Sequence, residues 1–159
     1  MKYGSKEVLD LQVFDKDGKY ITKIDTAVTS KFKVYYDKTK NKRVCEILVK
    51  DALLNFDLLE FINDYKEDTK SDFQKVLSQM QTKSLSFKEK IISKECKLIA
   101  QLVMVNQETG ERVEPRIKAE KAFISDDFQI NGDSIQSYDF DLKFEIMADS
   151  DGVLADFIF

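Results

Sequence analysis

Acidic residues at short spacing are the side chains of this 159-residue chain that come closest to the pattern of a metal site. Residues 15–18 and 149–152 both carry Asp-x-Asp-Gly, which is how a calcium-binding loop opens. Such a loop also needs a bidentate carboxylate at its twelfth position, where the first segment has Thr26 and the second has no carboxylate. We therefore predict that both segments are tight turns between strands.

Paired carboxylates, which could act as a general acid and base, occur at Asp126–Asp127 and at Asp139/Asp141. Asp139 and Asp141 alternate with large apolar residues, as does Glu145, and this places all three on the outward face of a strand. A solvated face is the favoured interpretation. In a ring of subunits the same acidic face, Asp139, Asp141 and Glu145, could line a channel or an interface.

The chain has no histidine, and so it lacks the commonest general base and the commonest transition-metal ligand. It also lacks CxxC, HExxH, GxGxxG and phosphate-loop motifs. Cys45 and Cys96 both lie in apolar runs, which favours two buried thiols over a disulfide or a metal pair. We therefore expect no enzyme activity, no metal and no cofactor.

A basic cluster spans residues 38–43 and contains Lys38, Lys40 and Arg43. The favoured interpretation is a solvated hairpin tip. The cluster has no interleaved aromatic residues, so it is not a stacking platform for single-stranded nucleic acid. A charged contact to a neighbouring subunit is the other possibility, and it makes these three residues candidate interface residues.

The overall composition is that of one folded domain over residues 1–159. Hydrophobic residues make up 43%, and a single Pro and five Gly leave little room for long linkers. Charged residues make up 34% with a net charge of −4, which is unusual for a general nucleic-acid binder but compatible with a wall that repels DNA. The apolar run 98–105 is too short to span a bilayer, and the N-terminal residues lack the apolar core of a secretion signal. We therefore expect a location inside the cell.

Alternating hydrophobicity predicts strands over residues 7–14, 20–24, 32–36 and 45–49, arranged as a meander of hairpins. The spacing of the apolar residues then changes from the two-residue period of a strand to that of a helix. Helical spacing over 57–65, with Asp57 as its cap, and over 71–80 predicts a helical insertion at about residues 56–82.

Strands are expected again in the second half. Residues 96–105 are apolar on both faces, which predicts a central strand covered on both sides. Pro115 should lie at an edge, a strand start or a bulge, and a slip in phase at residues 121–123 predicts a bend or bulge. Residues 138–146 are the clearest half-buried strand.

A final apolar strand is expected over residues 153–159. Its last residues, Phe157, Ile158 and Phe159, would be exposed unless they pair in a sheet or pack against a neighbour. They are therefore candidate interface residues. The predicted fold is mainly β (α+β): an antiparallel β-sandwich or curled sheet with one or two short flanking helices.

Four segments, in this order, carry a resemblance to a known family: residues 3–10, 51–54, 115–133 and 138–142. Together they resemble virion structural proteins of tailed bacteriophages, in particular the tail-tube-like family. The resemblance implies a homo-oligomer, commonly a hexameric ring, whose rings stack into a tube. It implies other virion proteins as partners, passive proximity to genomic DNA, and assembly in the host cytoplasm into the virion.

Residues 66–82 depart from the family's pattern, because this second helical segment enlarges the connection between the two halves of the sheet. They leave open another virion β-domain, such as a neck, baseplate, tail-completion or capsid decoration protein. A small carbohydrate- or peptide-binding β-sandwich is a further alternative, for which the chain offers Tyr35 and Tyr36 but no Trp.

Overall fold

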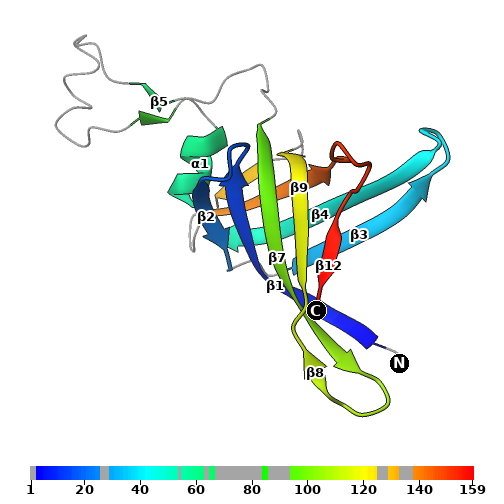
Figure 1. Ribbon diagram of the computed structural model, residues 1–159. Helices are drawn as coiled ribbons and strands as arrows, with labels where there is room; N and C mark the ends of the chain where they lie inside the picture. Colours follow the sequence, from blue (N-terminus) through cyan, green and yellow to red (C-terminus); the bar gives the residue numbers. More distant parts are fainter. Residues whose placement is uncertain are drawn as a thin grey trace, which may run out of the picture.

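The computed structural model describes residues 3–25, 29–53, 55–62, 65–66, 84–85, 94–124, 129–132 and 138–159. Within them, seven strands form the path of one large sheet: β1 (Tyr3–Asp15), β2 (Tyr20–Ile24), β3 (Thr29–Asp37), β4 (Lys42–Leu53), β7 (Glu95–Asn106), β9 (Arg116–Ile124) and β11 (Tyr138–Ile146). Three short strands pair off this path: β8 (Arg112–Val113), β10 (Gln129–Gly132) and β12 (Asp156–Ile158). Figure 1 shows these strands and the single described helix, α1 (Phe56–Ile62).

The order of the strands is β2-β1-β7-β9-β11-β4-β3, and every pairing is antiparallel. The hairpins β1–β2 and β3–β4 therefore lie at opposite ends of the sheet. The prediction of a meander over the first half is wrong, because β7, β9 and β11 lie between the two hairpins. Alternation of apolar residues reports which face is buried but not which strand is the neighbour.

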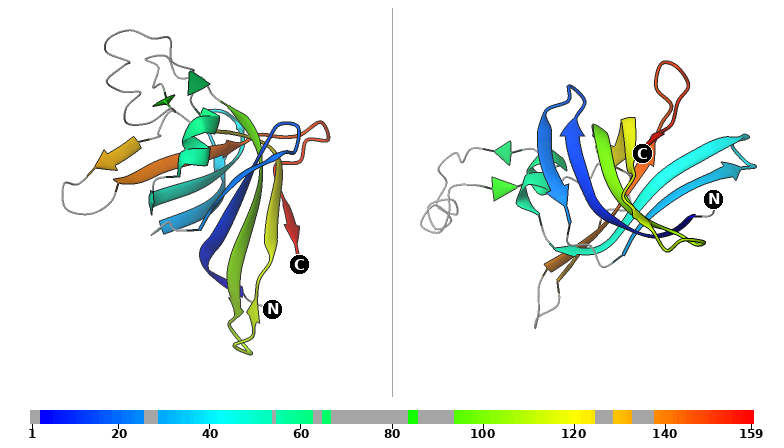
Figure 2. Two further views of the ribbon diagram at one scale, coloured as in Figure 1. Left: turned by 90° about the vertical axis from the view of Figure 1, so that its left-hand side faces the viewer. Right: turned by 60° about the horizontal axis from the view of Figure 1, so that its bottom comes forward.

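The sheet curls back on itself without closing, as both views in Figure 2 show. Strand β1 approaches β3, yet no backbone ladder joins them among the described residues. This confirms the prediction of a mainly β fold with a curled antiparallel sheet and a flanking helix. An open curl leaves two sheet edges, β2 and β3, which present unpaired backbone groups.

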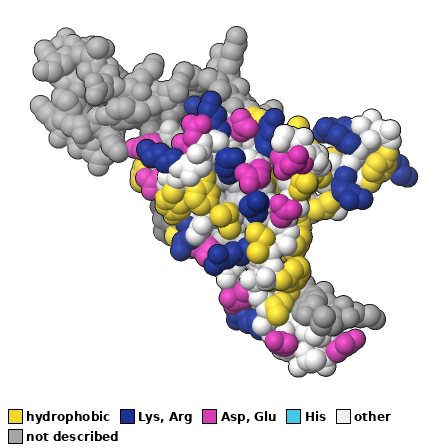
Figure 3. Space-filling view, viewed as in Figure 1, with side chains coloured by type: hydrophobic (Ala, Val, Ile, Leu, Met, Phe, Trp, Pro, Cys, Tyr) yellow, Lys and Arg dark blue, Asp and Glu magenta, His cyan; other side chains and the backbone are white. Residues whose placement is uncertain are grey.

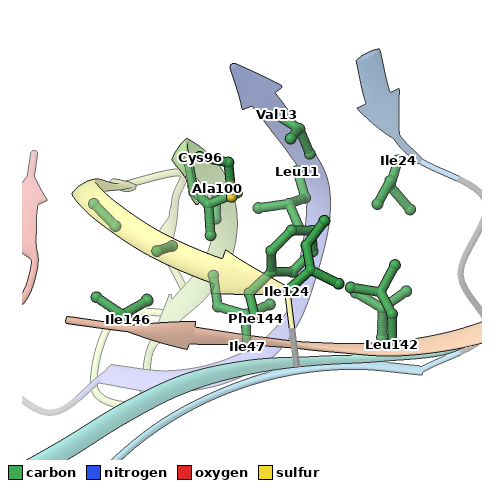
Figure 4. Packing of buried hydrophobic residues seen from close by; sticks show 14 of the residues in the cluster. Leu11, Val13, Ile24, Ile47, Cys96, Ala100, Ile124, Leu142, Phe144 and Ile146 are labelled. Atoms are coloured by element: carbon green, nitrogen blue, oxygen red, sulfur yellow. The ribbon is translucent and has the colours of Figure 1, made fainter. Parts of the chain in front are cut away.

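The core fills the inside of the curl. Figure 4 shows side chains from β1, β4, β7, β9 and β11 pointing toward one another. The largest fully buried side chains include Phe140, Phe144, Leu11 and Ile47. Strand β11 buries alternate residues from Phe140 to Ile146, as predicted. Strand β7 corrects its prediction: Lys97, Ile99 and Gln101 are only half-buried, so one of its faces borders solvent.

Register shifts interrupt several of the ladders, among them one on β9 and one on β4. On β7, one residue separates Cys96 from Leu98, whereas on β9 two residues separate the partners of these two. The extra residue on β9 is a bulge, and it confirms the predicted slip near residue 121. Pro115 immediately precedes β9, at a strand start as predicted, and its carbonyl accepts from the Leu102 amide at 2.9 Å. The second bulge, on β4, places Asp51 at φ 55°, and the Asp141 carboxylate opposite accepts from the Asp51 amide at 2.8 Å.

The helix α1 lies beside β2 and buries Leu58 and Leu59. Its first residue is Phe56, because Asn55 rather than the predicted Asp57 is its cap, and Tyr65, the predicted last residue of the helix, lies in a strand. The Asn55 side chain accepts from the Leu58 amide at 3.2 Å and donates to the Thr22 hydroxyl at 2.8 Å, which joins the start of the helix to β2.

Of the rest of the predicted insertion, the structure describes only the strand β5 (Tyr65–Lys66), which pairs with β6 (Ser84–Leu85) just beyond the predicted bounds. The predicted helix over 71–80 and the pair Asp126–Asp127 lie outside the described residues.

The two Asp-x-Asp-Gly segments are turns of the same geometry. In the first, the Asp15 carboxylate accepts from the amides of Asp17 and Lys19 at 2.9 and 2.8 Å. In the second, Asp149 accepts from Asp151 and Val153, both at 2.9 Å. Gly18 and Gly152 adopt φ values of 87° and 77°, which only glycine reaches easily. The predicted tight turns are confirmed at both places.

Candidate assembly interface

The C-terminal strand β12 pairs with the part of β9 that β11 does not reach. Residues 122–124 of β9 pair with β11, and residues 116–118 pair with β12. The predicted strand over 153–159 is therefore too long. Val153 closes the Asp149 turn, and Leu154 and Ala155 pack against the core, so pairing begins only at Asp156.

Charged side chains of β7, β9 and β12 form a row of ion pairs, one of which joins β12 to β9. Lys118 lies 3.1 Å from the Glu120 carboxylate and 3.9 Å from Asp156, and Lys97 lies 3.0 Å from Glu120. The hydrogen bond from Lys97 contributes most to lowering the pKa of Glu120, and the hydrogen bond to Glu120 contributes most to raising that of Lys118. These pairs are solvent-exposed, so each contributes little to stability.

Three aromatic rings form what we call the aromatic edge: Phe32, Phe157 and Phe159. The ring of Phe157 meets that of Phe32 edge-on with centroids 5.8 Å apart and stacks on Phe159 at 6.2 Å. Phe157 stays 43% exposed and Phe159 86% exposed. Ile158, whose strand position points to the opposite face, is 50% exposed. The predicted interface residues of the C-terminus therefore do lie at the surface, and Phe32 joins them there.

The hairpin β3–β4 forms an arm that projects from the sheet (Figure 1). Its tip is ordered by Asp37, whose carboxylate accepts from the Thr39 hydroxyl and from the amides of Thr39 and Lys40. The Thr39 hydroxyl contributes most to lowering the pKa of Asp37. Asn41 follows at φ 52° and accepts a hydrogen bond from the Tyr36 hydroxyl. The arm therefore presents its basic side chains from a turn with a defined backbone.

The arm bears exposed side chains on both faces. Lys38, Lys40 and Arg43 are all exposed, as predicted for a solvated hairpin tip. Tyr35 and Tyr36 are consecutive on a strand and so point to opposite faces, which prevents them from forming one binding platform.

A groove of about 550 Å³ runs between the arm and the segment that follows β11. Five basic side chains and two carboxylates line it, together with apolar residues. The charged lining residues are Lys40, Lys42, Arg43, Lys121, Lys143, Glu46 and Glu145. We call this the cationic groove. The sequence did not indicate Lys121 and Lys143 as members, because they come beside the arm only through the pairing of β11 with β4 and of β9 with β11, which no sequence spacing reports.

On the predicted acidic face, Asp141 and Glu145 are half-buried and alternate with the buried residues of β11. Asp141 accepts the Asp51 amide at the β4 bulge, and Glu145 lies 3.7 Å from Lys143. Asp139 belongs to β11 opposite Leu53, and its side chain lies outside the described part of the chain. The two described carboxylates thus have local structural partners.

The cysteines are free, fully buried thiols, as the sequence predicted. Burial is the largest cause that raises the pKa of Cys45 to about 11 and that of Cys96 to about 12. In the described part of the chain, no three acidic or thiol side chains are grouped so that they could hold a metal ion. Nor does any described helix have the length and apolar character needed to cross a membrane.

Comparison with protein-family models and with curated proteins gave no match to this chain.

Proposed function

We propose that this chain is a structural subunit of a bacteriophage tail, a tail-tube-like protein that assembles into stacked rings around a DNA channel. In this proposal it is not an enzyme. Its homo-oligomer, commonly a hexameric ring in the resembled family, contacts other virion proteins and passes genomic DNA without binding it specifically. It is assembled in the host cytoplasm and functions in the virion.

The aromatic edge is the observation that carries the proposal. Phe157 and Phe159 lie on an open sheet and leave much of their ring surface in water. Each fully buried ring of this size is worth about 1.5–3 kcal/mol, so covering them is a substantial driving force for association. Val34 and Tyr36, which follow Phe32 on the same face of β3, are exposed as well and extend the apolar surface along the arm.

The sheet edges support the same proposal. Strand β3 is the terminal strand of the sheet order and is nine residues long, far from the very short edge strands that proteins use to avoid pairing. Its lysines at positions 31 and 33 discourage indiscriminate pairing. A symmetric assembly accounts for both the long edge strand and its lysines, because each subunit then covers this edge in the same defined orientation.

The experiment compares the wild-type protein with a variant whose exposed C-terminal residues are polar, Ile158→Ser/Phe159→Ser. We expect wild-type rings or tubes by light scattering and a shift of the variant toward monomer. Both side chains are at least half exposed, so the monomer should keep its fold, as circular dichroism can check.

Phe56→Ser is the matched control, because Phe56 is 67% exposed on α1, away from the aromatic edge. It should assemble as the wild type does. A wild-type protein that stays monomeric at all accessible concentrations contradicts the proposal, as does an Ile158→Ser/Phe159→Ser variant that assembles normally.

A further inference from the structure

The cationic groove carries more positive charge than its own residues neutralise. Lys143 has a partner in Glu145, and Lys40 interacts electrostatically with Asp37. Lys42, Arg43 and Lys121 have no ion pair or side-chain hydrogen bond within the described residues. The groove is therefore suited to an occupant that brings carboxylates.

The hairpin β7–β8 carries the opposite charge at its tip. Its turn contains Glu108 and Glu111, both exposed, and neither carboxylate has a partner in the described part of the chain. The nearby Arg112 is already paired with Glu114 at 2.7 Å. The backbone of the tip is ordered by Asn106, which accepts from the amides of Glu108 and Thr109 at 2.8 and 3.2 Å. We call this tip the acidic hairpin.

The groove and the acidic hairpin do not meet within one molecule. In Figure 1 the β3–β4 arm and the β7–β8 hairpin leave the sheet in different directions. Figure 3 shows basic side chains gathered on the arm and acidic side chains at the end of the hairpin. Each surface therefore remains available to a second molecule.

We propose that the acidic hairpin of one copy of this chain docks in the cationic groove of the next. The inference rests on the proposed function and names the contact that joins neighbouring subunits. Because the two surfaces differ, the contact is head-to-tail, and head-to-tail contacts build rings when their rotation closes. Charge complementarity also disfavours the alternatives, groove against groove and hairpin against hairpin, which bring like charges together.

Two charge-reversed variants test the contact. The hairpin variant is Glu108→Lys/Glu111→Lys, and the groove variant is Lys42→Glu/Arg43→Glu. All four side chains are exposed, so both variants should fold. Lys16→Glu/Lys19→Glu, on the exposed β1–β2 turn, makes the same charge change as the groove variant and serves as its control.

Each variant alone should need at least about tenfold more protein than the wild type to assemble in sedimentation velocity, because attraction has become repulsion. Their equimolar mixture should assemble again, since each hairpin then finds a groove of opposite charge. Wild-type assembly should also weaken as salt rises, because exposed charges are screened beyond about 10 Å at 0.1 M. Rings in the mixture should contain an even number of subunits, with the two variants alternating.

If the wild type and both variants assemble equally well, or if the mixture fails to recover, this contact is wrong while the proposed function stands. If the wild type never assembles, the proposed function fails and the contact with it. A third result would also overturn the contact. In it, a DNA oligonucleotide binds the wild type, whereas the groove variant does not bind DNA and still assembles. That outcome would make the groove a nucleic-acid surface.

Discussion

At the scale of single residues, the thiols and carboxylates that could have bound a metal or acted in catalysis instead stabilise the fold. Cys45 and Cys96 fill the core, and the carboxylates of Asp15 and Asp149 accept backbone amides in turns. Each of these roles follows from local sequence: a thiol in an apolar run, or Asp-x-Asp-Gly between strands. They could be predicted because no distant partner is needed to define them.

The thiols give a prediction at this scale. An ordinary thiol is largely ionised at pH 10, whereas pKa values of about 11 and about 12 keep Cys45 and Cys96 protonated. Because both are also fully buried, we expect a thiol reagent such as iodoacetamide to modify neither in the native protein between pH 8 and pH 10. Mass spectrometry should show two modifications after unfolding in guanidinium. Labelling of the native protein at the rate of the unfolded chain would contradict the buried placement.

At the scale of elements, the start of α1 depends on Asn55. Replacing Asn55 with Ala removes the acceptor for the Leu58 amide and the hydrogen bond to Thr22. We expect this change to lower the free energy of unfolding by about 1–2 kcal/mol, measured by urea denaturation.

Asp57→Ala is the comparison for that change. Asp57 lies in the first helical turn, where its charge is worth only about 0.3–1 kcal/mol. If Asp57→Ala destabilised the protein more than Asn55→Ala, the assignment of the cap would be wrong.

Some features of the strands could be predicted from the sequence and others could not. Alternation located most strands and their buried faces, and the slip near residue 121 predicted the β9 bulge, because both patterns are local. The position of β7, β9 and β11 between the two N-terminal hairpins depends on long-range pairing that alternation does not encode. The short β12 likewise depends on how much of the β9 edge β11 leaves unpaired.

At the scale of the whole molecule, the candidate interface could be predicted only in part. Phe157, Ile158 and Phe159 stand out in the sequence as consecutive large apolar residues, and they are exposed in the structure. The curl brings the side chain of Phe32 to them, whereas strand pairing places Lys121 and Lys143 beside the arm. The sequence pattern identifies which residues need a partner, and the three-dimensional curl determines which surfaces they form.

The proposed function requires that this chain assemble with itself into rings. The most direct measurement is negative-stain electron microscopy of the purified wild-type protein at the concentration where light scattering shows its largest mass. We expect rings of uniform diameter with a central channel, alone or stacked into tubes. Monodisperse particles of the 18.4 kDa monomer at every concentration would contradict it.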